Sequence, residues 1–398
     1  MGRQPAAARS GPGCHALALL ALLLTPALEA EAVGCRAVAP RSTAELTAPG
    51  PFAVGVTTRT FVDSSRPTPP NGSFPGAASR TLVTEVWYPA TVPGRDAPPE
   101  PSLAAVPVIV HSHGFLDSRL GESFLTEHLA SRGYVVAAPD YPLSHGGAPG
   151  GATVADVPEQ PGDWSFVLDA VLGAFPSLAD PGRVGASGLS LGGLTTLLVT
   201  YHPELRDPRI GAALPMAGPG CFFGRRFFRT TSTPLLVLHG DSDLIVPFKE
   251  NALRVFRRAR GPKLLVRLRD GSHTGFSVFA PLFDPSQHFD AIGCAALTGG
   301  LGDGIPSDPN ANPFEALGGR EQGILLDPRL CPLPCEAPVP VTPSMGAARH
   351  HELTRAVATA FFDAYLRSDE SARCFLRSGL ARESPDVAVR RRGLLRGR

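Results

Sequence analysis

Charged residues are scarce in this chain of 398 residues: they make up 18% of it, and the formal net charge is only +1. Proteins that bind nucleic acid or acidic surfaces concentrate charge of the opposite sign, so this balance predicts no nucleic-acid partner. We find no internal repeat and no second block of distinct composition. Apolar residues make up 43%, which indicates one globular domain with a sizeable core.

A long apolar run is also missing. The longest near the N-terminus, "ALALLALLL" at residues 16–24, is too short to span a bilayer. Arginines precede it, and a proline and the small residues Ala30 and Ala32 follow, which is the layout of a signal peptide at residues 1–32. We therefore expect a secreted or periplasmic protein. Lipid anchoring at Cys35, which ends "AVGC", is the less favoured alternative because glutamates interrupt the approach to it.

Cysteines are few, and no Cys-x-x-Cys or spaced histidine pair accompanies them, so the sequence predicts no zinc or other metal site. Removing the leader takes Cys14 with it. Six cysteines in an exported chain suit up to three disulfides, and their pairing cannot be deduced from the sequence. These are Cys35, Cys221, Cys294, Cys331, Cys335 and Cys374.

Strand-like and helix-like segments alternate along the chain, which predicts an α/β fold: a mostly parallel central sheet with helices on both faces. The expected strands lie at 52–60, 80–88, 106–114, 134–140, 183–187, 211–218, 234–240 and 263–270. A turn-rich connector joins the first two, so we expect them to form an antiparallel edge of the sheet. The expected helices lie at 118–133, 163–174, 191–201 and 350–367. The predicted domain is 33–376, with a loop-rich insertion at 291–345 and a basic, disordered tail at 377–398.

The stretch "GLSLGG" places Ser190 where a predicted parallel strand ends and a helix begins. Such a turn lifts the side chain out of the sheet edge, and flanking glycines allow the backbone to crowd there. A serine hydroxyl is a poor nucleophile unless a base and an orienting acid activate it. Ser190 is therefore a candidate nucleophile if both partners follow.

Both partners follow at the ends of later strands, in the order that this arrangement requires. Asp243 ends "PLLVLHGDSD", and His273 ends "LLVRLRDGSH". An oxyanion hole would come from the backbone N–H groups of Phe115, in "HSHGF", and of Leu191 at the helix N-terminus. The sequence thus predicts a catalytic triad of Ser190, Asp243 and His273.

Each assignment has an alternative. Asp241 is the rival acid in "GDSD", although a turn-capping role is more usual for such a residue. His111, His113 and His145 could be metal ligands, but hydrogen bonding within loops is the favoured interpretation. Asp270 is expected to be a solvated turn residue.

The pattern resembles the α/β-hydrolase superfamily. The residues that carry it are "GPFAVGVTTRT" from Gly50, "RTLVTEVWYPA" from Arg80, "VPVIVHSHGF", "GLSLGG" and "DGSHTGF". Within that superfamily the chain is similar to platelet-activating-factor acetylhydrolases and dienelactone-hydrolase-like esterases, and it also looks similar to cutinase-like polyesterases. Leu189 stands where relatives often carry histidine or an aromatic residue, which leaves the substrate open.

The resemblance implies a secreted serine carboxylic ester hydrolase of lipid catabolism that needs no cofactor. It would act as a monomer on short acyl esters of phospholipid-like or small substrates, with transient contact to a lipid surface. Phe222 and Phe223 could line the acyl pocket and Arg225 and Arg226 could meet a headgroup, or the aromatics could simply pack on the core. The alternatives are a polyesterase or lipase with the same triad, and a non-catalytic binding protein of the same fold.

Overall fold

The computed structural model describes residues 1–2, 35, 38–103, 105–298 and 314–393. Almost all of the predicted signal peptide, including both expected cleavage positions, lies outside these residues. Among the described residues, no helix is both long and apolar enough to cross a membrane.

A ten-stranded sheet forms the centre of the molecule, in the order β10-β9-β8-β7-β6-β4-β5-β2-β1-β3. Its strands are β1 (Ala53–Asp63), β2 (Arg80–Ala90), β3 (Gly94–Arg95), β4 (Val106–Ser112), β5 (Val135–Pro139), β6 (Ala179–Leu189), β7 (Ile210–Met216), β8 (Leu235–Gly240), β9 (Lys263–Leu268) and β10 (Val387–Arg392). Strands β4 to β9 pair in parallel, whereas β1 and β2 pair antiparallel at one side, as expected.

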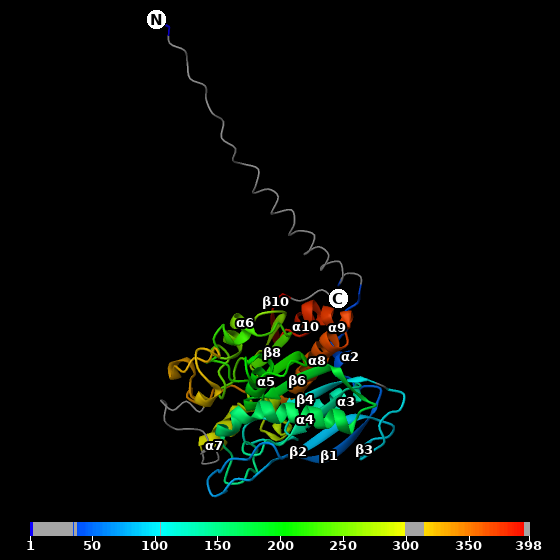
Figure 1. Cartoon of the computed structure of the whole chain (residues 1–398). Helices are drawn as coiled ribbons and strands as arrows, with labels where there is room; N and C mark the ends of the chain where they lie inside the picture. Colours follow the sequence, from blue (N-terminus) through cyan, green and yellow to red (C-terminus); the bar gives the residue numbers. More distant parts are fainter. Residues whose placement is uncertain (3–34, 36–37, 104, 299–313, 394–398) are drawn as a thin grey trace.

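Helices cover both faces of the sheet (Figure 1). They are α2 (Thr43–Thr47), α3 (Ser123–Ser131), α4 (Gln160–Ala174), α5 (Leu191–Tyr201), α6 (Ala252–Arg258), α7 (Asp290–Thr298), α8 (Ala347–Leu366), α9 (Glu370–Cys374) and α10 (Leu380–Glu383). Successive residues of a strand point to opposite faces. Ile109 of β4 accordingly packs with α3 and α8, while Val108 and Val110 pack with α4 on the other face. The buried strands explain the near-continuous apolar runs in the sequence.

The expected disordered tail at 377–398 is wrong for residues up to 393. Helix α10 is followed by β10, which pairs antiparallel with β9 from Val387 to Arg392. Three arginines end this strand at the edge of the sheet, where charged side chains oppose pairing with another chain. Residues 394–398 lie outside the described residues.

The segment expected to be a loop-rich insertion, 291–345, is mostly irregular where it is described, but it begins inside helix α7. Two of the three disulfides hold it. Cys221 pairs with Cys331 and Cys294 with Cys335, while Cys35 pairs with Cys374 in α9. Because its sulfur is bonded to Cys374, Cys35 cannot carry a lipid thioether, and the alternative of lipid anchoring is wrong. The three disulfides indicate an extracellular or periplasmic location.

Arg80, at the start of β2, is fully buried between two carboxylates. Its Nε donates to Asp163 at 2.7 Å, and its Nη2 donates to Asp156 at 3.0 Å and to Asp163 at 2.6 Å. Burial raises the pKa of Asp156 to about 6, although Arg80 acts to lower it. The ion pair joins the antiparallel edge of the sheet to α4.

Removing this guanidinium should destabilise the fold strongly. Arg80→Met is expected to lower the free energy of unfolding by about 3–5 kcal/mol, because two buried carboxylates lose their common partner. Urea unfolding followed by circular dichroism measures this. Arg226→Met removes an arginine from an exposed ion pair with Glu321 and should change stability by less than about 1 kcal/mol. Equal effects of the two substitutions would contradict the role assigned to Arg80.

Candidate active site

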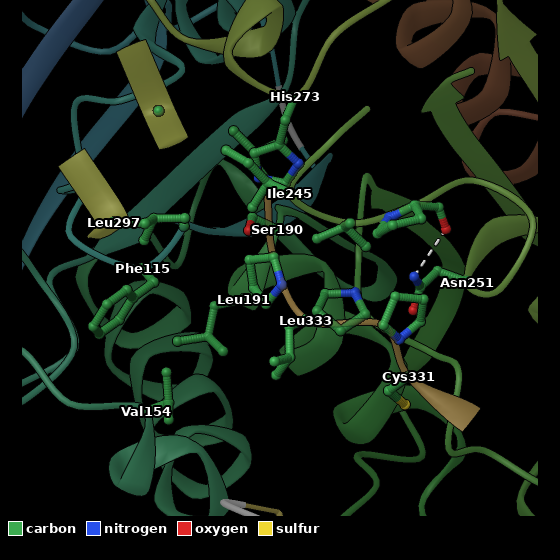
Figure 2. A pocket seen from close by; sticks show the side chains of 18 of the residues that line it. Phe115, Val154, Ser190, Leu191, Ile245, Asn251, His273, Leu297, Cys331 and Leu333 are labelled. Carbon is green, nitrogen blue, oxygen red and sulfur yellow. Dashed lines mark hydrogen bonds between the residues drawn. The ribbon is translucent and has the colours of Figure 1, made fainter. Parts of the chain in front are cut away.

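Ser190 occupies the sharp turn between β6 and α5. Its backbone has φ 54° and ψ −117°, a conformation that a non-glycine residue adopts only when its surroundings impose it. Two hydrogen bonds hold the turn: the Ser190 N–H donates to the Met216 carbonyl at 2.9 Å, and the Leu194 N–H donates to the Ser190 carbonyl at 3.0 Å. The side chain of Ser190 lies at the wall of a cavity (Figure 2).

Glycines on both sides of Ser190 make the turn sterically possible. A Cβ on Gly188 would lie 2.3 Å from the Gly192 carbonyl oxygen, and one on Gly192 would lie 2.0 Å from that of Ser112. These distances are far below any van der Waals contact. The packing of α5 against β6 and β4 therefore requires glycine at positions 188 and 192.

Asp243 and His273 meet at the ends of β8 and β9. The Nδ1 of His273 lies 2.8 Å from Oδ2 of Asp243, and both residues are buried. The other oxygen of Asp243, Oδ1, accepts the N–H groups of Ile245 at 2.9 Å and Val246 at 2.7 Å. The carboxylate is thus fixed by its own loop and oriented toward the imidazole, which lines the same cavity as Ser190.

Charge interactions shift both groups of this pair toward their ionised forms. Burial by itself raises the pKa of Asp243, but the charges and hydrogen bonds of His273 and His239 outweigh it and hold that pKa well below its usual range. Burial likewise lowers the pKa of His273, but the Asp243 carboxylate raises it overall. Buried opposite charges in direct contact stabilise one another in this way.

Asp241, the rival acid, does not contact His273 but holds a turn. Its Oδ1 accepts the N–H of Asp270 at 2.8 Å, and its Oδ2 lies 3.4 Å from Nε of Arg267. Asp270 is exposed, as expected for a turn residue. The geometry thus brings Asp243, rather than Asp241, to the imidazole.

The loop "HSHGF" after β4 lies against Ser190, since a Cβ on Gly114 would lie 3.4 Å from Ser190 Cβ. Burial lowers the pKa of His113, which favours the neutral ring. Its Nε2 accepts the Tyr141 N–H at 3.1 Å, so its Nδ1 donates to the Gly114 carbonyl at 2.7 Å. The peptide is trans, so the Phe115 N–H points away from His113.

The three histidines weighed as metal ligands all make hydrogen bonds to protein groups. His111 bonds Ser187 at 2.9 Å and Glu122 at 2.9 Å, and His145 accepts the N–H of Gly147 at 3.1 Å. All three thus have hydrogen-bond partners in the protein, although His111 lies in β4 rather than in a loop. Among the described residues, no group of three or more histidine, cysteine, aspartate or glutamate side chains is placed to hold a metal.

A cavity of about 470 Å³ opens over Ser190 and His273 (Figure 2). Its wall is mainly apolar and comes from several elements: Phe115 and Leu191 beside Ser190, Ile245 from the loop after β8, Leu297 from α7, and Phe222, Phe314, Leu325 and Leu333 from loops. The disulfide-held segment that the sequence indicated only as an insertion therefore forms one side of the cavity. A cavity of this size and character is typical of small-molecule sites.

Burial makes two carboxyl groups near the cavity, those of Asp117 and Glu122, harder to ionise. Asp117 lines the cavity, and burial raises its pKa to about 7. Burial also raises the pKa of the neighbouring Glu122 to about 8. Proton retention by these groups limits the negative charge beside Ser190.

The aromatic cluster after β7 divides in two. Phe222 lines the cavity and stacks on Phe314 with ring centroids 5.0 Å apart. Phe223 is fully buried in the core and stacks on Phe227 at 3.8 Å. Arg225 and Arg226 are exposed, and Arg226 pairs with Glu321. The alternative in which the aromatics pack on the core thus holds for Phe223, and Phe222 is the one that reaches the cavity.

Sequence reasoning missed two residues at the site. His239, at the end of β8, lies with Nε2 3.1 Å from Oδ2 of Asp243 and 2.7 Å from the Val246 carbonyl. Asp290, the first residue of α7, accepts backbone N–H groups from the loops of both Asp243 and His273. His239 could have been noticed because it lies in the strand that leads into the Asp243 loop, whereas nothing in the irregular sequence around Asp290 marks it.

Comparisons with known proteins find similarity to ester hydrolases. Residues 75–142 match the family model for platelet-activating factor acetylhydrolase, isoform II. "Lipase 1" of Moraxella sp. (strain TA144) is 32% identical over 129 residues, which are 32% of this chain and 34% of the lipase. The match thus spans about a third of that relative's length. A ferulic acid esterase from Streptomyces cinnamoneus superposes with a TM-score of 0.58 at 24% identity, covering 86% of this chain and 98% of the esterase.

The sheet order, the crossover helices and the similarity to a solved esterase over nearly its whole length confirm the predicted fold class. The family model matches residues 75–142, which contain β2 to β5. All three names denote ester hydrolases. The chain is accordingly an α/β-hydrolase-fold protein similar to platelet-activating-factor acetylhydrolases and related esterases.

Proposed function

We propose that the protein is a secreted serine carboxylic ester hydrolase in which Ser190, His273 and Asp243 form the catalytic triad. The observation that carries the proposal is the buried hydrogen bond of 2.8 Å between His273 and Asp243, beside a serine on a strained strand-to-helix turn in the same apolar cavity. The similarity to three kinds of ester hydrolase supports it.

In the first chemical step, Oγ of Ser190 attacks the ester carbonyl. Because Nδ1 of His273 donates to Asp243, its Nε2 is free to take the serine proton. The proton then passes to the leaving alcohol, and an acyl-serine remains. Water, activated by the same imidazole, releases the acid and restores Ser190. No cofactor takes part.

Two backbone N–H groups would stabilise the oxyanion. Leu191 is the first residue of α5, so its N–H has no acceptor within the helix. Phe115 follows the Gly114 carbonyl that His113 holds, and this bond fixes the peptide plane that contains the Phe115 N–H. Donors that are oriented before the reaction cost no reorganisation when the charge develops.

The cavity wall supports a proposal for the substrate class. Its described residues include aromatic and aliphatic side chains and no lysine or arginine. Such a wall favours an uncharged ester with an apolar acyl group, and it gives an anionic headgroup no cationic partner. We therefore favour small neutral esters over phospholipid-like ones. The ferulic acid esterase relative makes an aromatic acyl group a candidate.

A polyesterase or lipase acting on insoluble esters is the second candidate. Phe279 and Leu333 line the cavity, and each is well exposed at 57% and 44%. Apolar side chains that are exposed at the rim of an apolar cavity could meet a lipid or polymer surface.

A signal peptide at 1–32 and a monomeric state remain predictions of the sequence.

Ser190→Ala should abolish hydrolysis of p-nitrophenyl acetate, because the hydroxyl supplies the bonding electron pair. The circular dichroism spectrum should stay unchanged. Wild-type levels of hydrolysis in this variant would reject the nucleophile, and a wild-type protein that hydrolyses no ester would favour the binding-protein alternative.

The pH profile of kcat/KM should show that His273 acts as a base. The imidazole must be neutral to accept the proton, and Asp243 raises its pKa above the ordinary value of about 6.5. Activity should therefore fall as the pH decreases through a value above about 6.5. Asp243→Asn removes the carboxylate, so it should shift this midpoint downward and reduce kcat by roughly 10⁴-fold. A midpoint that Asp243→Asn leaves in place would contradict the assignment.

An acyl panel at constant alcohol should locate the preferred substrate. We expect kcat/KM to rise from acetyl to butyryl, octanoyl and cinnamoyl esters, because the cavity of about 470 Å³ exceeds what an acetyl group fills. Micellar substrate and polyester film are the comparison arms. A preference for acetyl over every larger group would contradict the substrate class, and a strong preference for film or micelles would favour the second candidate.

A further inference from the structure

Asp290 is a buried carboxylate with no assigned role, and its hydrogen bonds reach both loops of the proposed acid–base pair. Its Oδ2 accepts the N–H of Leu244 at 2.9 Å and of His273 at 3.1 Å. Its Oδ1 accepts the N–H and the hydroxyl of Thr274, each at 2.8 Å. One fully buried side chain therefore receives four hydrogen bonds.

The donors to Asp290 belong to two different loops. Leu244 directly follows Asp243 in the loop after β8, while His273 and Thr274 belong to the loop after β9. His288 adds a contact to the first loop, since its Nε2 lies 2.8 Å from Oγ of Ser242. Asp290 thus connects the backbones of the two loops whose side chains meet in the His273–Asp243 hydrogen bond.

We propose that Asp290 is a positioning residue for the acid–base pair: its carboxylate binds the backbone of both loops and fixes the distance and orientation between Asp243 and His273. The inference rests on the proposed function, because it assigns Asp290 to the machinery of that site. No atom of Asp290 needs to touch the substrate.

The chemistry of the donors requires a carboxylate at this position. All four groups donate, and a carboxylate is the side chain that only accepts. An amide of the same shape would turn one NH₂ toward these donors and lose at least one bond. Since catalysis depends on reacting groups held to within an ångström, loosening the two loops should slow the reaction about 100-fold at most.

Asp290 also contributes to the charge around His273. Three carboxyl groups act to raise the pKa of the imidazole. They belong to Asp243 in the loop after β8, to Asp290 in α7 and to Glu122 directly before α3. His239 contacts the same oxygen of Asp243, Oδ2, as His273 does, and His350 of α8 packs against the loop at Gly275. Loss of the Asp290 charge should therefore lower the pKa of His273, with Asp243 still in place.

Helix α7 contains both Asp290 and part of the cavity wall. Gly293, Ala296 and Leu297 line the cavity, and Cys294 is bonded to Cys335. The N–H of Cys335 in turn donates to the Leu244 carbonyl at 2.8 Å. The loop that carries Asp243 is therefore bonded both to Asp290 and to Cys335, which belong to the same disulfide-linked segment.

Asp290→Asn tests the proposal, and Asp284→Asn is the matched control. Asp284 is an exposed carboxylate six residues earlier whose bonds stay within its own turn, to Ser286 and Gln287. In Asp290→Asn we expect kcat on the best ester to fall about 10- to 100-fold with KM within about twofold. The midpoint of the His273 titration, measured by ¹⁵N NMR of the imidazole, should move downward. Neither quantity should change in Asp284→Asn.

Thr274→Val keeps the test decisive if Asp290→Asn does not fold. It conserves shape and removes only the hydroxyl that donates to Oδ1, so a smaller fall in kcat is expected. Unchanged kcat and an unchanged His273 midpoint in the folded variants would overturn the proposal. If the wild type hydrolyses no ester, the proposed function fails, whereas the NMR titration still reports whether Asp290 acts on His273.

Discussion

The turn at Ser190 is the constraint on which the rest of the site depends. A serine held at positive φ is tolerated because β6, α5 and the loop after β4 meet there at distances that leave no room for another side chain. Glycines at 188, 192 and 193 allow this packing, because a Cβ at any of them would collide with neighbouring backbone atoms. The Met216 carbonyl, which accepts the Ser190 N–H, ties the turn to the neighbouring strand.

Burial and neighbouring charges shift the pKa values of several ionisable groups around this turn. His273 and Asp243 form the hydrogen-bonded acid–base pair of the proposed triad, and each favours the ionised form of the other. Burial lowers the pKa of His111 and His113, which favours their neutral rings, and it raises the pKa of Asp117 to about 7 and that of Glu122 to about 8. An oxyanion forming near Phe115 would therefore meet hydrogen-bond donors and few opposing charges.

Much of the architecture could be predicted because its signals are local. The apolar runs of β4, β5, β8 and β9 report burial on both faces, and the glycine-flanked Ser190 reports a strand-to-helix turn. The residues that the sequence did not reveal work through contacts distant along the chain. Asp290 bonds residues 16 to 46 positions away, and β10 is a short basic strand whose partner lies more than a hundred residues earlier. Such pairings leave no periodic pattern, and arginines at a sheet edge resemble a solvated tail.

The disulfides Cys221–Cys331 and Cys294–Cys335 have a consequence for when the protein becomes competent. Both anchor the segment that forms one side of the cavity, and none of their four cysteines lies in a strand of the sheet. In a reducing compartment the sheet can still assemble from its apolar strands, while the substrate-facing wall lacks its covalent anchors. We therefore expect oxidation of these cysteines to complete the cavity, so that a reduced chain would carry Ser190 beside an unfinished cavity wall.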